Sequence, residues 1–375
     1  MLAPLRWLGR QGTRAVAAVI FLGIAVPPLG EVLRPYVGVA VFALLFISFM
    51  RIDISALVKH MRRPGNVIAA TVWTSIAIPL LAGGTSEFIG IGSVSPGLFN
   101  GIILQSASSP MMAAPAIAAL LGLDATLILI ALVGSSLLVP LTAPFFAYFF
   151  VGDALAISPS LLGWKLFGLL ASSAIVGLGL RRCLGVARIE RYRQEIDGTN
   201  IIGLFLFAAA LMVDVATALV EDPLLWFALL LAGLISFLFF FGLSLLVFWR
   251  VGRDIALAIA FMTAQRNVGL MLAVAGNVLS DITWLYFALS QLPVYLSPHF
   301  LEPIVKRIKR ADPTGKLECR PSRPLRRNPR MPYSLFLIDR HSHRVRHPER
   351  RCNRRPICGW PYNPTLEGSS RRPLR

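Results

Sequence analysis

Long apolar runs separated by short polar stretches fill the first 305 residues of the chain. Each run is long enough for an α-helix to cross a bilayer, which takes roughly 17–25 residues. The pattern predicts an all-α polytopic membrane protein with ten transmembrane helices. The predicted spans are residues 14–30, 32–50, 66–90, 95–122, 124–150, 159–180, 200–220, 223–249, 254–279 and 281–301.

Two of these runs contain polar residues near their middles. Residues 104–118 carry hydroxyl and amide side chains with two prolines, and residues 262–269 read Met-Thr-Ala-Gln-Arg-Asn-Val-Gly. A helix broken at membrane depth leaves backbone groups that lipid cannot satisfy, so it must face protein or a water-filled cavity. The alternative is a structural role, because serine and threonine hydroxyls can donate to backbone carbonyls of their own helix. The candidate substrate-binding residues are Gln105, Ser106, Ser108, Ser109, Thr263, Gln265, Arg266 and Asn267.

The two breaks fall at matching places when the chain is divided near residue 151. Residues 14–150 and 151–304 then hold five spans each, and the fourth span of each half contains the break. Five is an odd number, so the halves must have opposite orientations in the membrane. Such inverted repeats are typical of secondary transporters, whose broken helices meet at the substrate site. The pattern therefore predicts crossing broken fourth and ninth helices.

Basic residues gather in alternate loops between the predicted spans. Loops after the second, sixth and eighth spans are rich in Lys and Arg, and the intervening loops carry mostly Asp and Glu. By the positive-inside rule both termini, including residues 1–13, are expected in the cytoplasm. We expect an integral multi-pass protein of the plasma (inner) membrane.

The positive charge of the chain belongs to its last segment. Residues 306–375 carry 20 of the 37 Lys and Arg and 5 of the 19 Asp and Glu, a net charge of +15 out of +18. The predicted tail, residues 305–375, is too polar to bury a core and should be a disordered cytoplasmic segment. It could have no specific function, for example as an out-of-frame extension, or lie on an anionic leaflet. A nucleic-acid arm is disfavoured because no aromatic interleaving or folded module accompanies the charge.

The amino-acid composition is typical of a membrane protein, and the cysteines predict neither a metal site nor a disulfide. The chain is 15 % charged with a mean hydropathy of +0.67, whereas a soluble domain is nearer a quarter charged. The four cysteines fit neither a disulfide framework nor a zinc site. Asn100, Thr74, Asn277 and Gln291 are weaker polar candidates that interhelical hydrogen bonds would explain, and Lys165 can snorkel to the outer interface.

Arg266 is the sharpest single candidate, because a guanidinium near the bilayer centre costs several kcal/mol and needs a partner or water. One interpretation is an ion pair that locks helices, with Asp214 of the seventh span as the partner. The other is an anion site in which the fork of donors binds a carboxylate or sulfonate. Asp214 is also the candidate coupling residue that carries a proton, or it lies near the outer surface and is hydrated.

Three motifs resemble the bile acid:sodium symporter family. They are Ser-Ala-Ser-Ser-Pro-Met-Met at 106–112, Leu-Gly-Leu-Asp-Ala-Thr at 121–126 and Arg-Asn-Val-Gly-Leu at 266–270. The resemblance covers roughly residues 15–305 and ends on Leu-Pro-Val-Tyr-Leu-Ser-Pro at 292–298. It implies a panel domain and a core domain, fourth and ninth helices that are unwound and cross at the substrate site, and alternating access by movement of one domain against the other.

The sequence departs from that family where sodium would bind. The resemblance implies an acidic residue four positions before a Gln-Asn pair on the ninth helix. Here Arg266-Asn267 occupies the pair and Met262 the acidic position, and hydroxyl ligands of the fifth helix correspond to Ile128 and Leu132. A hard cation needs several oxygen ligands, so sodium coupling is disfavoured. We hypothesise that Arg266 supplies fixed positive charge where the coupling ion would lie.

The sequence thus predicts a secondary active transporter of small organic anions that resembles the bile acid:sodium symporters. Proton coupling or exchange is favoured over sodium coupling, and no other cofactor is expected. The alternative is a non-transporting, carrier-like membrane scaffold or sensor. An enzyme is not expected, because no Ser/His or paired-acid arrangement is visible within the spans.

Overall fold

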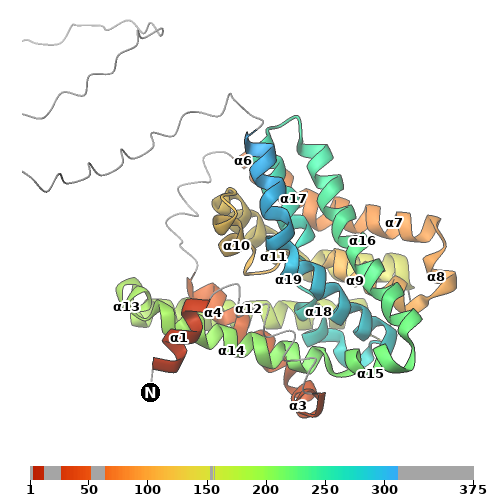
Figure 1. Ribbon diagram of the computed structural model, residues 1–375, viewed down its shortest axis with the longest axis horizontal. Coiled ribbons are helices and arrows are strands. Elements are labelled where there is room, and N and C mark those ends of the chain that lie inside the picture. Colours follow the sequence, from red (N-terminus) through yellow and green to blue (C-terminus); the bar gives the residue numbers. More distant parts are fainter. Residues whose placement is uncertain (1–2, 12–26, 52–63, 153–154, 156, 311–375) are drawn as a thin grey trace, which may run out of the picture. The chain divides into compact units, whose positions relative to one another are not determined.

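The structure is a computed structural model that describes residues 3–11, 27–51, 64–152, 155 and 157–310. These residues form helices, with no β-strand among them (Figure 1). Most of the predicted first span, residues 14–30, and nearly all of the predicted tail, residues 305–375, lie outside the described residues.

Six helical stretches are long and apolar enough to cross a membrane, which supports the predicted class. The count of ten spans and the inverted repeats stay predictions. The six stretches are Pro28–Arg51, Gly65–Phe88, Ala125–Val151, Pro159–Leu184, Arg193–Glu221 and Pro223–Phe248.

The helices follow the apolar runs of the sequence. In the first half of the chain they are α1 (Ala3–Gln11), α3 (Pro27–Leu33), η1 (Arg34–Tyr36), α4 (Val37–Arg51), α6 (Pro64–Val72), η2 (Trp73–Ala77), α7 (Ile78–Phe88), α8 (Ile91–Val94), α9 (Pro96–Ala107), α10 (Ala114–Leu120) and α11 (Ala125–Val151). In the second half they are α12 (Pro159–Leu184), α13 (Val186–Arg191), α14 (Arg193–Leu211), α15 (Val213–Glu221), α16 (Pro223–Phe248), α17 (Arg253–Ala264), α18 (Val268–Ala275), η4 (Gly276–Val278) and α19 (Asp281–Arg310).

Two groups of helices are visible within residues 3–310. In the first group, α4 packs on α12 and α14, and α1 packs on α14, while α9, α11, α16, α17 and α19 form the second group (Figure 1). Helix α18 contacts α4 and α12 of the first group and α9 of the second. This short helix therefore lies between the two groups.

Small residues let helices approach closely, as is common in membranes. A Cβ atom at Gly177 of α12 would lie 2.6 Å from the carbonyl oxygen of Phe46 on α4. At Gly101 of α9 it would lie 2.5 Å from the ring of Tyr286 on α19. Only glycine fits these two contacts without movement of the neighbouring helix.

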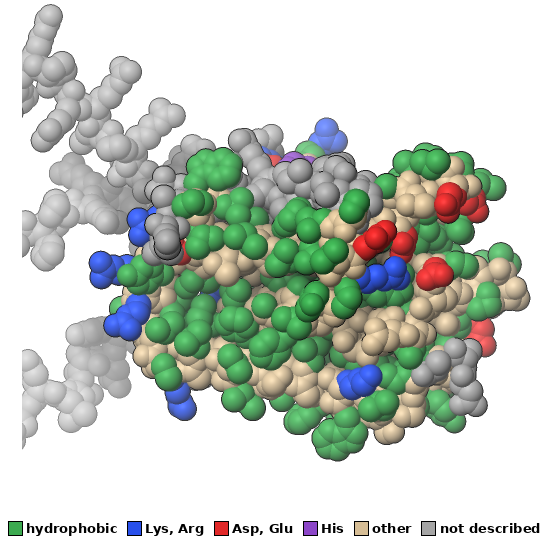
Figure 2. Space-filling model, turned by 90° about the horizontal axis from the view of Figure 1, so that it is seen from below, with side chains coloured by type: hydrophobic (Ala, Val, Ile, Leu, Met, Phe, Trp, Pro, Cys, Tyr) green, Lys and Arg blue, Asp and Glu red, His purple; other side chains and the backbone are tan. Residues whose placement is uncertain are grey.

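Large apolar side chains also cover outward faces, as a lipid-facing surface requires. Leu137, Leu141, Phe145 and Phe149 recur along α11 and are all more than half exposed. Figure 2 shows hydrophobic side chains over much of one face of the molecule. Such extensive apolar exposure is unusual for a water-soluble monomer and expected in a bilayer.

Candidate functional site at the crossing of two broken helices

Both predicted helix breaks are present. Helix α9 ends at Ala107, the backbone at Ser108 is extended (φ −72°, ψ 159°), and α10 begins at Ala114. Helix α17 ends at Ala264, and α18 begins at Val268 after three residues outside any helix. The prolines and polar side chains of residues 104–118 and 262–269 therefore located the breaks correctly.

The two unwound segments pair with each other. The backbone N–H of Met111 donates to the carbonyl of Gln265 (2.6 Å), and that of Asn267 donates to the carbonyl of Ser109 (2.9 Å). These bonds form an antiparallel bridge between Pro110 and Arg266. Each break thus satisfies backbone groups that the other leaves free, which removes the penalty of unpaired groups in an apolar medium. The segments cross, as the sequence predicts.

Arg266 lies at this bridge and is fully buried. Its Nη1 donates to the carbonyls of Ser108 (2.8 Å) and Thr74 (3.2 Å), and its Nη2 donates to Thr74 (3.2 Å). Its guanidinium carbon lies 5.4 Å from the centroid of the Phe240 ring, a cation–π contact. Backbone carbonyls and an aromatic face thus hold the charge.

The carbonyl of Thr74 is available because of a π-helical turn. Residues Trp73–Ala77 form this turn, and the N–H of Ile78 donates to the carbonyl of Trp73, five residues earlier. The partner of Thr74 in the same pattern would be the N–H of residue 79, which is proline and has none. Arg266 therefore supplies a donor that the helix lacks, and π-turns are frequent at functional sites.

Asp214 does not pair with Arg266. It accepts from Nη1 of Arg34 at 3.2 Å, and its side chain is 50 % exposed. Within the described residues no acidic side chain forms an ion pair with Arg266. The predicted Arg266–Asp214 pair is wrong, because Asp214 lies on the partly exposed helix α15 and has a nearer cation. Its role in coupling stays a prediction.

Several candidate side chains are used by the fold itself. The hydroxyls of Ser106, in α9, and Ser108, directly after it, donate to the carbonyls of Ile103 and Gln105, each three residues earlier. A buried serine commonly satisfies its hydroxyl in this way, by bonding to a nearby backbone carbonyl. At these two positions the hydroxyls are therefore explained by local structure and not by a ligand.

Gln105, Gln265 and Thr263 use their side chains for contacts between helices. The amide oxygen of Gln105 accepts from the hydroxyl of Tyr286, whose oxygen also lies 3.0 Å from that of Ser236. The side-chain nitrogen of Gln265 donates to Ser297 (2.6 Å) and to the carbonyl of Val294 (3.3 Å). The hydroxyls of Thr263 and Thr74 lie 3.4 Å apart.

Three buried polar atoms at the crossing have no hydrogen-bond partner among the described residues. They are the hydroxyl of Ser109, the amide oxygen of Gln265 and Nε of Arg266. Leaving such an atom unpaired costs about 1–3 kcal/mol, so each marks a place where a ligand or water would be stabilising. Asn267 differs from the other candidates because it is only partly buried. These four residues form the candidate site.

The site does not fit sodium. Met262, Ile128 and Leu132, at the positions where the resemblance implies oxygen ligands, are apolar and fully buried. The carbonyls of Thr74 and Ser108, which could ligate a cation, already accept from Arg266. A hard cation would have to displace the guanidinium and tolerate its charge.

Tyr286 and Ser297 are functional neighbours that the sequence did not single out. Both lie on α19 among apolar residues, and both hold an amide side chain of a broken helix. A tyrosine hydroxyl within a predicted span is a weak signal, because a buried tyrosine ordinarily finds some partner. Nothing in the sequence indicates that the partner is Gln105.

Comparison with known proteins places the matched part of the chain within one family. Residues 38–222 match the model of the Sodium Bile acid symporter family. The match takes in α4 to α15, with the first break and Thr74, and it ends before Arg266. A search of the curated proteins found no match.

Proposed function

We propose, on the premise that residues 38–222 match the Sodium Bile acid symporter family, that the chain is a secondary transporter of small organic anions. It works by alternating access in ten membrane spans arranged as two inverted repeats, with both termini in the cytoplasm. Six apolar helical stretches support the multi-pass membrane character, and the match of residues 38–222 supports a transporter family. The anionic substrate and the mechanism of coupling are our proposal.

The observation that supports an anion is the set of donors that Arg266 leaves unused. A guanidinium has five N–H donors in a planar fork. Both hydrogens of Nη1 and one of Nη2 go to backbone carbonyls, and Nε has no partner. The second hydrogen of Nη2 and that of Nε lie on one edge of the fork. This edge matches the two oxygens of a carboxylate or sulfonate.

Access to this edge requires a change of conformation, because Arg266, Ser109 and Gln265 are all fully buried. Helix α18 lies between two groups of helices, so movement of one group against the other would open the crossing on one side. Burial in the closed state is what alternating access requires of a central site. Asn267, which is partly exposed, would contact the substrate first.

Coupling in our proposal does not involve sodium. Arg266 stays in place as a fixed cation throughout the cycle, so transport is an exchange of anions or is driven by protons. Asp214 is the proposed proton carrier, since it lies within a membrane-spanning stretch and its side chain is half exposed.

The test is uptake into proteoliposomes of a panel that includes bile acids, benzoate and benzenesulfonate, with sodium and pH gradients imposed separately. We expect uptake of at least one anion without sodium, and loss of that uptake in Arg266→Gln. Full uptake by this variant would refute the proposed anion site. Binding of an anion without flux would favour the alternative of a carrier-like scaffold or sensor.

A further inference from the structure

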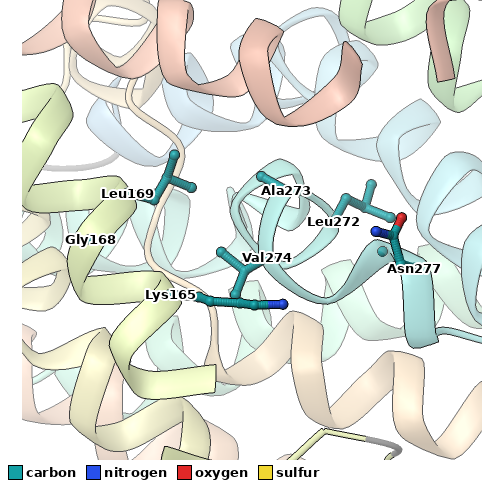
Figure 3. A pocket seen from close by; sticks show the side chains of 8 residues that line it. Lys165, Gly168, Leu169, Leu272, Ala273, Val274 and Asn277 are labelled. Atoms are coloured by element: carbon teal, nitrogen blue, oxygen red, sulfur yellow. The ribbon is translucent and has the colours of Figure 1, made fainter. Parts of the chain in front are cut away.

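A cavity of about 390 Å³ lies between α12 and the end of α18. Lys165, Gly168 and Leu169 line it from α12, and Leu272, Ala273, Val274, Gly276 and Asn277 line it from α18 and η4 (Figure 3). Its volume is at the lower end of the range in which proteins bind small organic molecules. The wall on α18 and η4 begins at Leu272, six residues after Arg266 or about 9 Å along the helix axis at about 1.5 Å per residue, and Arg266 is not among the residues that line the cavity.

Lys165 gives this cavity an uncompensated positive charge. It lies within the apolar membrane-spanning helix α12 and forms neither an ion pair nor a hydrogen bond with a described residue. Figure 3 shows its side chain reaching from α12 toward α18. The nearby cation Arg34, which lies over the ring of Trp284, is already paired with Asp214. An unpaired lysine in a membrane helix is stable when it faces water or an anion.

Lys165 and two neighbouring residues of α12 form one wall of the cavity. Lys165, Gly168 and Leu169 are three and four residues apart and share one helical face, which is the cavity wall. Lys165 and Gly168 are exposed at this wall, and Trp164 and Phe167 are exposed on the adjacent face of the helix. A Cβ atom at Gly168 would meet no atom within 4 Å, so the space beside the lysine is open.

We propose that this cavity is a second anion-binding site, at which Lys165 binds the carboxylate or sulfonate of a small organic anion and Asn277 donates a hydrogen bond to it. The chemical class of the ligand rests on the proposed function, and the presence of a lysine in the cavity wall does not. The site holds an anion next to α18, the second half of the broken helix, before the anion reaches Arg266.

The first test measures the charge of the cavity without transport. A single cysteine is introduced at a lining residue without a role in binding, by Ala273→Cys, in a full chain in which Cys183, Cys319, Cys352 and Cys358 are changed to serine. Its reaction rate is compared for an anionic and a cationic methanethiosulfonate reagent of similar size. We expect the anionic reagent to be favoured about fivefold to tenfold, and Lys165→Gln but not Lys165→Arg to remove the preference. Lys306→Gln, which changes a lysine paired with Glu302, is the matched control.

The second test measures occupancy of the cavity. Benzoate should slow labelling of the cysteine at position 273, and neutral benzamide should not. Gly168→Leu should abolish this protection by filling open space, whereas Gly179→Leu on the same helix, where a Cβ also meets nothing within 4 Å, should retain it. Protection that persists in Arg266→Gln shows two separate sites even if uptake is lost. Equal labelling by both reagents, or no protection by benzoate or benzenesulfonate, would overturn the proposal.

Discussion

Arg266 donates hydrogen bonds from both of its terminal nitrogens to the backbone carbonyl of Thr74. The two residues are 192 positions apart in the sequence. The π-turn at Trp73–Ala77 and the proline that follows it leave this carbonyl without a donor from its own helix. The same guanidinium also reaches the carbonyl of Ser108. One side chain therefore ties the α6–α7 span to both broken helices.

Replacing Arg266 should separate its structural role from its role in transport. Arg266→Lys keeps the charge but offers a single nitrogen in place of a planar fork, so it cannot match both carbonyls and a bidentate anion. We expect Arg266→Lys to remain folded and to lose most of its uptake. Arg266→Gln should lose uptake entirely. Uptake assays and size-exclusion profiles of the purified variants measure the two effects.

A structural role for Arg266 alone would give a different pattern in those assays. Both variants would then lose stability in proportion to their loss of uptake. Stable, well-folded Arg266→Lys with normal uptake would contradict the prediction.

Removing the hydroxyl of Tyr286 should destabilise the protein. In Tyr286→Phe the buried amide oxygen of Gln105 loses its donor, which costs about 1–3 kcal/mol. We expect a lower melting temperature in detergent. Tyr148→Phe is the control, because Tyr148 is exposed and its hydroxyl has no hydrogen-bond partner among the described residues. Equal melting temperatures for Tyr286→Phe and the unchanged protein would show that the bond contributes nothing.

The close contact of α9 with α19 predicts a penalty for a single methyl group. In Gly101→Ala the new Cβ would lie 2.5 Å from the Tyr286 ring, so the ring or the helix must move at a cost of about 1–3 kcal/mol. Gly84→Ala in α7 should be neutral or slightly stabilising, because its Cβ meets nothing within 4 Å. Thermal unfolding of the two variants side by side measures the difference. An unaltered melting temperature for Gly101→Ala would mean that α9 and α19 separate easily.

Sodium should have no effect on transport by this chain. The oxygens at the crossing are bound to a guanidinium, and the neighbouring positions 128, 132 and 262 are apolar. Replacing sodium by choline on both sides of the membrane should leave the uptake rate unchanged within error. Sodium should also fail to raise the melting temperature, as a bound ion would. Stabilisation by millimolar sodium but not by choline would contradict this prediction.

The Arg34–Asp214 pair should matter little for stability and much for coupling. An ion pair this exposed contributes about 0–1 kcal/mol. We therefore expect Asp214→Asn to melt close to the unchanged protein. In our proposal, anion uptake by the Asp214→Asn variant is no longer driven by an imposed pH gradient, although the variant still exchanges anions. A pH-driven uptake that survives Asp214→Asn would exclude this residue as the proton carrier.

The sequence allowed the two breaks and their crossing to be predicted because proline and clustered polar residues are strong signals in an apolar helix. It also located Arg266 as a buried cation. It did not indicate the partners of that cation, since a carbonyl becomes available only when the local turn is π-helical, and Thr74 shows no such signal. The hydrogen bond between Gln105 and Tyr286 could not be predicted from the sequence either, because it depends on which face of α19 packs against α9.

The mutual pairing of the two breaks has a consequence for biogenesis. The N–H of Met111 and the carbonyl of Ser109 find their partners only at Gln265 and Asn267, more than 150 positions later in the chain. At a synthesis rate of about 5–20 residues per second, the first broken helix waits roughly 8–30 s for them. During that time water, an insertase or a membrane chaperone must cover its open backbone. Truncating the chain anywhere before Gln265 should therefore leave a first half that is degraded or aggregates.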